Sequence, residues 1–237
     1  MMIREAFHVL WQTLKGIWEE LYSLAIVNLV WLLSWGLPLA LIPSLNSVAL
    51  AIPLTVLAAL LFSVTTSGIY CVTSRVARGT TFHFSDFIDG IKLYWWRSLL
   101  WLVANAAVLF LIRTNLDFYP TILQGTWAII IGGFWMAVLL FWIIMQFYFW
   151  PVLVQQEQPK MLLAWKNAAY LILASPFYAF LMVIFSFIFM ALSIGLILPL
   201  IFVGMAIIAL LGSTAALEIL VKFKIIEDPR PKPYAGH

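Results

Sequence analysis

The chain has 237 residues, of which 65% are apolar and only 10% are charged, and its mean hydropathy is +1.05. A soluble domain has about 25% charged residues and cannot hide this much apolar surface from water, so the composition excludes a water-soluble protein and predicts an integral membrane protein. The net charge of +3 would also fit a nucleic-acid-binding protein, but no basic stripe stands apart from the apolar runs, and we expect no nucleic-acid partner.

The first 20 residues carry Glu5, Glu19 and Glu20 and predict an amphipathic helix rather than a cleaved signal peptide. Six apolar runs follow, and we interpret each as a membrane span because about 20 apolar residues cross the hydrocarbon core. The runs are Leu21–Pro43, Ser47–Val72, Ser98–Arg113, Trp127–Val154, Phe177–Ile194 and Leu196–Val221. The third run is short unless a helix enters it from about Phe84. Five spans remain the alternative if residues 177–221 form a re-entrant or continuous pair.

The basic residues fall almost entirely on one side of this map. Twelve of the 13 Lys and Arg residues lie in the N-terminal segment, the second and fourth connections and the tail, and only Arg113 lies on the other side. Cytoplasmic loops of membrane proteins carry an excess of Lys and Arg. We therefore expect a multi-pass membrane protein with both termini in the cytoplasm.

The stretch from Arg75 to Arg97 collects six charged side chains between two apolar runs. Within it, apolar residues recur at helical spacing, and Asp86, Asp89 and Lys92 fall on another face. Ser85 and Asp86 suit a helix start, where a side-chain oxygen accepts backbone N–H groups. The pattern predicts an interfacial amphipathic helix that continues into the third span.

A similar amphipathic segment precedes the first, third and fifth spans. The three segments are LWQTLKGIWEEL, FIDGIKLYWWRS and MLLAWKNAAYLI, with Lys15, Lys92 and Lys166 at equivalent places. We predict an all-α polytopic membrane helical bundle of about six transmembrane helices, arranged as three tandem hairpins with amphipathic lead-in helices. The hairpins are residues 1–78, 79–155 and 156–222, followed by a cytoplasmic tail, 223–237. External turns are expected at Pro43–Asn46, Thr114–Gly125 and Ser193–Gly195.

Three stretches resemble the YesL-like family of bacterial membrane proteins: SGIYCVTSRVARGTTFHFSDFIDGIKLYWWRSLL, FYFWPVLV and LLAWKNAAYLILASPFYAF. The resemblance covers residues 20–190, and TTSG stands where the family has a proline-containing small motif. It implies a multispanning cytoplasmic-membrane protein of unknown function. Genes of this family often accompany those for carbohydrate uptake and breakdown, which implies an accessory or permease-like role. The family assigns no catalytic residues.

Polar side chains inside the apolar runs are the candidate binding residues, because each one costs free energy in hydrocarbon. Either they converge on a small polar cavity or they bond neighbouring helices together. The candidates are Thr65, Thr66, Ser67, Tyr70, Asn105, Gln146, Tyr148 and Glu218. Glu218 has three interpretations: an ion pair with Lys222 at i+4, an interhelical hydrogen bond, or a carboxylate that couples transport to protons or cations. Asn28 is a further buried amide, and Arg113 is expected to pair with Asp117.

Enzyme motifs are missing from the sequence, so we expect no enzyme, no cofactor and no metal. Cys71 is the only cysteine, the three histidines are far apart, and most of the tryptophans and phenylalanines are expected to face lipid or the membrane interface. Two hypotheses for function remain. The first is an accessory or permease-like component for small polar solutes, linked to carbohydrate uptake. The second is a non-transporting scaffold or lipid-binding protein that organises a membrane complex. The expected partners are membrane lipids and either a transport complex or a second copy of the chain.

Overall fold

The computed structural model describes residues 2–45 and 47–230, and the regular elements in these two segments are all helical. Six helical segments in this described part are long and apolar enough to cross a membrane, so the chain is a polytopic helical membrane protein, as predicted. The elements are α1 (Met2–Glu19), α2 (Leu21–Leu41), the 3₁₀ turn η1 (Ile42–Ser44), α3 (Val48–Ala77), α4 (Phe84–Ile122), α5 (Thr126–Gln155), α6 (Met161–Ala174), α7 (Pro176–Leu196), α8 (Leu198–Phe202) and α9 (Gly204–Lys222).

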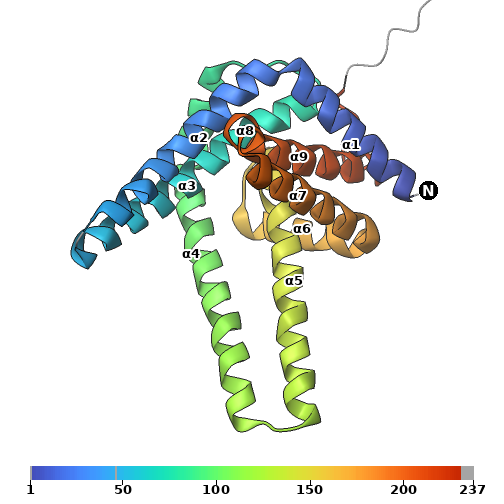
Figure 1. Cartoon of the computed structure of the whole chain (residues 1–237). Helices are drawn as coiled ribbons and strands as arrows, with labels where there is room; N and C mark the ends of the chain where they lie inside the picture. Colours follow the sequence, from blue (N-terminus) through green and yellow to red (C-terminus); the bar gives the residue numbers. More distant parts are fainter. Residues whose placement is uncertain (1, 46, 231–237) are drawn as a thin grey trace, which may run out of the picture.

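The spanning helices pair as three hairpins, α2 with α3, α4 with α5, and α7 with α9 (Figure 1). The hairpins meet at what we call the base, which comprises residues 63–77 of α3, 84–98 of α4, 144–153 of α5, and α9. From the base they point in different directions, and the outer parts of α4 and α5, residues 101–143, project alone (Figure 1). We call this projection the arm.

Helix α4 is a single helix of 39 residues, so the predicted amphipathic lead-in does continue into the third span. At 1.5 Å per residue it is about 58 Å long, roughly twice the thickness of the hydrocarbon core. Its start is held by Asp86, whose carboxylate accepts the backbone N–H of His83 at 2.9 Å and lies 3.2 Å from the guanidinium of Arg75. The charges of this stretch therefore fix the helix start and tie it to the end of α3.

Helix α1 does more than lie at an interface. Its buried residues Ala6, Val9, Thr13 and Ile17 recur at helical spacing, and the helix packs against α7 and α9. One side of the helix is thus covered by protein, whereas Phe7, Trp11 and Trp18 remain exposed on another side. The lead-in of the third hairpin, α6, likewise packs against α5 and α7.

The second external turn is much shorter than predicted. Residues of the expected loop Thr114–Gly125 stay helical as far as Ile122, and only residues 123–125 form the turn, where Gly125 takes a positive φ of 64°. The polar residues that pointed to a loop bond within the helix instead. Arg113 pairs with Asp117 at 2.7 Å, as expected from their spacing, and the Asn115 amide donates to the Leu111 carbonyl at 2.7 Å.

The last apolar run was predicted to form one helix, but in the structure it forms two, α8 and α9. Helix α7 continues through the expected turn at Ser193–Gly195 to Leu196, and the chain then breaks at Ile197, which has a positive φ of 58°. The five-residue α8 follows, and a second break at Val203 precedes α9. Pro199 lies in the first turn of α8, where its missing N–H removes no helical hydrogen bond.

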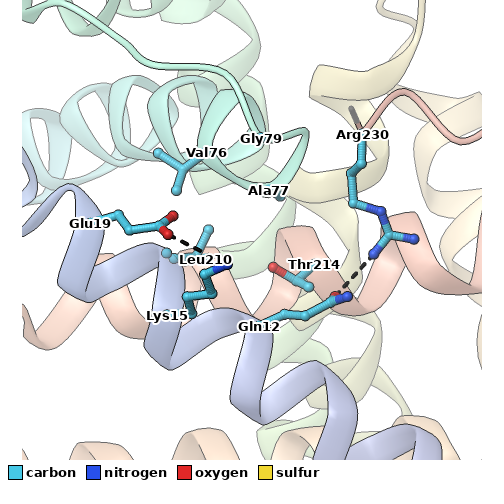
Figure 2. Close-up of a pocket in the computed structure, with 10 residues that line it drawn as sticks. Gln12, Lys15, Glu19, Val76, Ala77, Gly79, Leu210, Thr214 and Arg230 are labelled. Carbon is cyan, nitrogen blue, oxygen red and sulfur yellow. Dashed lines mark hydrogen bonds and ion pairs between the residues drawn. The ribbon is translucent and has the colours of Figure 1, made fainter. Parts of the chain in front are cut away.

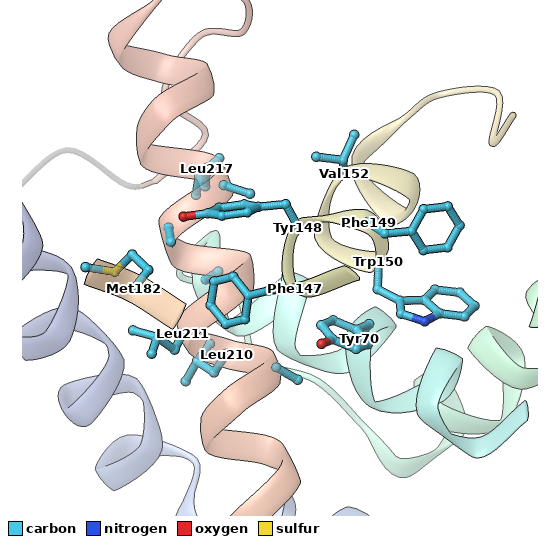
Figure 3. Packing of buried hydrophobic residues seen from close by; sticks show 14 of the residues in the cluster. Tyr70, Phe147, Tyr148, Phe149, Trp150, Val152, Met182, Leu210, Leu211 and Leu217 are labelled. Carbon is cyan, nitrogen blue, oxygen red and sulfur yellow. The ribbon is translucent and has the colours of Figure 1, made fainter. Parts of the chain in front are cut away.

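Small residues allow close packing at the base. A Cβ added at Gly90 on α4 would lie 2.6 Å from Cys71 Cβ on α3, and one added at Gly68 would lie 2.6 Å from the Phe87 ring. On the other side of α3, Tyr70 stacks on Trp150 of α5 (Figure 3). The end of α5 is enclosed on every side, because its neighbours there are α3, α6 and α9.

Candidate functional site

Two of the predicted polar residues meet between α4 and α5, within a network of four side chains. The Asn105 amide donates to Gln146 Oε1 at 3.3 Å. The indole of Trp101 donates to the same oxygen at 2.7 Å, and that of Trp142 donates to Asn105 Oδ1 at 3.0 Å. The network joins the two helices of the arm at the point where they enter the base.

The two tryptophans of this network were expected to face lipid, and their role as donors was missed. The sequence did carry a signal, since WLVAN and WIIMQ each place an indole four residues before an amide. That spacing puts both groups on one face of a helix. Trp31 and Trp150 are also exceptions to the expectation, because they are only 4% and 1% exposed.

The hydroxyl cluster of α3 bonds to its own helix and to α2. Thr65, Thr66 and Ser67 each donate to a carbonyl about one turn earlier, at 2.6–2.7 Å. Thr66 also accepts from the indole of Trp31 at 3.0 Å, and Thr65 lies 3.3 Å from the Ser34 hydroxyl. These groups therefore act in packing the first hairpin.

Tyr70 and Tyr148 are both buried in the base but belong to different contacts. Tyr70 faces Trp150, whereas Tyr148 and Phe147 pack beside Leu217 of α9, with Met182 of α7 close by (Figure 3). The Tyr148 hydroxyl has no hydrogen-bond partner among the residues that the structure describes. Neither tyrosine takes part in the network of Asn105 and Gln146.

Glu218 lies apart from the other candidates and makes a different ion pair from the one predicted. Its carboxylate is 3.0 Å from Arg230 of the tail, whereas Lys222 pairs with Glu5 of α1 at 2.7 Å. The i+4 spacing made a Glu218–Lys222 pair available, but α1 and the returning tail offer better placed partners. Glu218 thus belongs to the contact that holds the tail.

Arg230 also lines a pocket of about 180 Å³ between α1, α3, α9 and the tail (Figure 2). Arg230 donates to Gln12 at 3.0 Å and makes two bonds of 2.8 Å to Asp228, which hold the pKa of that carboxyl below its usual range. The Thr214 side chain lies beside Gln12, and its buried hydroxyl has no hydrogen-bond partner in the described part of the chain. Arg230 is already paired with the carboxylates of Glu218 and Asp228. The residues around the pocket therefore act to hold the tail against the helices.

The break between α8 and α9 is bridged by Asn28 of α2, which is fully buried. Its amide N–H donates to the Ile201 carbonyl at 2.8 Å, and its Oδ1 accepts the N–H groups of Met205 and Ala206 at 2.9 and 3.2 Å. Backbone groups freed by a broken helix must be bonded inside a membrane protein. Asn28 supplies those bonds, and the sequence predicted only an interhelical amide here.

Two grooves open at the surface of the helices. One, of about 510 Å³, lies between α2 and α8 and is lined by Leu21, Tyr22, Ala25, Pro199, Phe202 and Val203. The other, of about 820 Å³, lies between α4 and the start of α6. Tyr22 and Phe202 are 86% and 51% exposed, so the first groove is an open apolar surface.

The fold and these contacts define the class, a multi-pass helical membrane protein whose intramembrane polar groups bond helix to helix. Protein-family models, curated proteins and solved structures were each compared with the chain, and none matched. The function is therefore inferred from the geometry of the chain itself.

Proposed function

We propose that this chain is a membrane scaffold that binds lipid and organises a membrane complex without moving solute itself. The observation that carries the proposal is the apolar groove between α2 and α8, which is open at the surface and lined by five apolar residues and Tyr22. Exposed apolar surfaces of this kind mark sites of interaction with membranes, proteins or apolar ligands. On a membrane protein, the acyl chain of a lipid is the occupant at hand.

The hydrogen-bond and ion-pair partners of the polar candidate residues support the same proposal. Asn105 and Gln146 bond to each other and to two indoles, and Glu218 pairs with the tail. These groups hold elements together at two separate places. A solute pathway would instead need them to face one common cavity.

We further propose that the protein resides in a bacterial cytoplasmic membrane with both termini in the cytoplasm. The unequal distribution of Lys and Arg supports this placement, as does the resemblance to the YesL-like family. Tags placed at residues 123–125 and at the C-terminus should be reached from opposite sides of the membrane. Access to both tags from one side would contradict the topology.

Lipid binding can be tested on the full-length protein purified in a mild detergent. We expect phospholipid to remain bound, and we expect its removal to lower the unfolding temperature and its return to restore it. Ala25→Trp should fill the groove between α2 and α8 and reduce the bound lipid, whereas Ile129→Trp on the exposed arm should not. Retention of no phospholipid, with an unchanged unfolding temperature, would overturn the proposal.

A second candidate, an accessory or permease-like role for small polar solutes, is supported by the break between α8 and α9. Discontinuous helices whose ends face a substrate form binding sites in many transporters, and α9 begins directly after such a break. This candidate predicts solute entry into vesicles that contain the protein, and slower entry with Asn28→Ala or Glu218→Gln. Entry no faster than into empty vesicles, over a broad panel of sugars, would count against it.

A further inference from the structure

The groove between α4 and α6 combines apolar and basic residues in one place. Its walls are Trp96, Arg97 and Leu100 on α4, and Lys160, Met161, Leu162, Leu163 and Lys166 at the start of α6. Leu162 is 81% exposed and Trp96 is 56% exposed, so the apolar wall is open to the surroundings. Tryptophans are common at the headgroup level of membranes.

The three basic residues of this groove are not neutralised by any described residue. Ion pairs in the described part of the chain engage Lys15, Arg75, Lys92, Lys222 and others, but none engages Arg97, Lys160 or Lys166. The described residues that line the groove include no carboxylate. The nearest in sequence, Glu157, is exposed and lies outside it. Within residues 2–45 and 47–230, the groove therefore carries three positive charges and no counter-charge.

The guanidinium of Arg97 is fixed by two hydrogen bonds to backbone carbonyls. Its Nε donates to the Pro159 carbonyl at 3.0 Å, and one terminal nitrogen donates to the Leu93 carbonyl at 3.1 Å. A guanidinium has five N–H donors, so three remain for a ligand. The bond to Pro159 also fixes the loop that leads into α6.

The start of α6 adds a weaker attraction for an anion. The helix has 14 residues, and no side chain of the described residues caps its first N–H groups. Such groups favour negative charge. They lie next to Lys160, and the basic side chains and the helix end therefore attract the same kind of ligand.

We propose that this groove binds an anionic glycerophospholipid, with its phosphate among Arg97, Lys160 and Lys166 and an acyl chain along Leu100, Leu162 and Leu163. The inference rests on the proposed lipid-binding function and names the class of lipid. Basic pockets between membrane helices bind anionic headgroups. A zwitterionic lipid fits less well, because its own cationic group meets three positive charges. Free phosphate would fit less well than a phospholipid, because it has no acyl chain to cover the apolar wall of the groove.

The test is native mass spectrometry of the full-length protein, exchanged into equal amounts of phosphatidylglycerol and phosphatidylcholine. Wild-type protein should bind the anionic lipid in preference, by roughly tenfold or more. The triple variant Arg97→Gln, Lys160→Gln, Lys166→Gln should lower the preference to near one. A control that removes three positive charges elsewhere, Lys15→Gln, Arg113→Gln, Lys224→Gln, should keep it.

Two further measurements separate the remaining outcomes. The double variant Lys160→Gln, Lys166→Gln leaves the bonds of Arg97 intact and should show an intermediate preference even if the triple variant folds poorly. Excess inorganic phosphate should not displace the lipid. Equal binding of both lipids by wild-type protein, or full displacement by phosphate, overturns this inference while the proposed lipid-binding function stands. Retention of neither lipid overturns both.

Discussion

The two halves of α5 differ in burial although both are strongly apolar. None of residues 126–143, which belong to the arm, is buried, whereas nine of the ten residues 144–153 at the base are buried, Gln146 being the exception. A similar contrast separates α9 from α4. In their most apolar 18-residue stretches, 72% of α9 is buried but only 6% of α4. Apolar character therefore does not distinguish the protein interior from the surface that faces lipid.

The closeness of the helix contacts distinguishes them better. Helix α9 contains Gly212, Ser213, Ala215 and Ala216 in its buried centre, and a Cβ added at Gly212 would lie 3.2 Å from the Phe147 carbonyl oxygen. In a membrane, helices associate through close packing and polar bonds, because lipid tails are as apolar as the side chains. Glycines of the base such as Gly212 thus lie in close helix contacts, whereas an added Cβ at Gly132 or Gly133 of the arm meets nothing within 4 Å.

The largest effect should come from filling the close contact between α3 and α4. Gly90→Leu places a side chain where a Cβ alone already lies 2.6 Å from Cys71 Cβ, and we expect a loss of about 3 kcal/mol in the free energy of unfolding. Gly133→Leu, on the arm where nothing lies within 4 Å, should change it by less than about 0.5 kcal/mol. Unfolding in mixed micelles of increasing SDS measures both. Equal losses would erase the distinction between base and arm.

A somewhat smaller effect is expected from the bridge over the broken helix. Asn28→Ala leaves two N–H groups of α9 and one carbonyl of α8 without these bonds, which should cost about 2 kcal/mol. Asn115→Ala, which loses one exposed bond within α4 of the arm, serves as the control and should have little effect. The same SDS titration applies. A similar small change in both variants would mean that Asn28 does not hold the junction.

The network between Asn105 and Gln146 should contribute less. Asn105→Leu, Gln146→Leu and the double variant form a double-mutant cycle, in which we expect a coupling energy of about 0.6 kcal/mol, since polar bonds between membrane helices are modest on average. The network lies where the arm joins the base, so the coupling energy measures how strongly polar bonds hold the two arm helices together at that junction. A coupling energy of zero would show that the two amides act independently.

The smallest effect is expected at the arm's far end. Arg113→Gln removes an ion pair whose side chains are 78% and 57% exposed, so the loss should stay below about 0.5 kcal/mol despite the short distance of 2.7 Å. Raising the salt concentration should reduce the difference between wild type and variant further. A loss as large as that of Asn28→Ala would show that the arm is not an independent, exposed element.

Much of the fold could be predicted, because span length and the placement of charge obey strong rules. The stretch from Arg75 to Arg97 shows this, since its helical periodicity predicted the long α4. The turn at Thr114–Gly125 was predicted too long, because polar residues that bond at i+4 within a helix look like a loop in sequence. The second break, at Val203, was missed because an apolar run gives no sign of where a helix stops.

The candidate site was harder to predict, because it depends on which apolar faces meet. Asn105 and Gln146 do meet, but nothing in one sequence showed that Glu218 would turn to Arg230, eight residues beyond the end of α9. The basic groove depends on α4 and α6 lying together, 62 residues apart at Arg97 and Pro159. Such contacts across long separations leave no periodic pattern in the sequence.

The most direct test of the contrast between base and arm is cross-linking to a phospholipid that carries a photoreactive diazirine in its acyl chain. The protein is reconstituted unmodified, irradiated and digested, and labelled peptides are mapped by mass spectrometry. We predict dense labelling of α4 and α5 within residues 101–143 and almost none within residues 206–217 of α9. Labelling of α9 as dense as that of the arm would contradict the account.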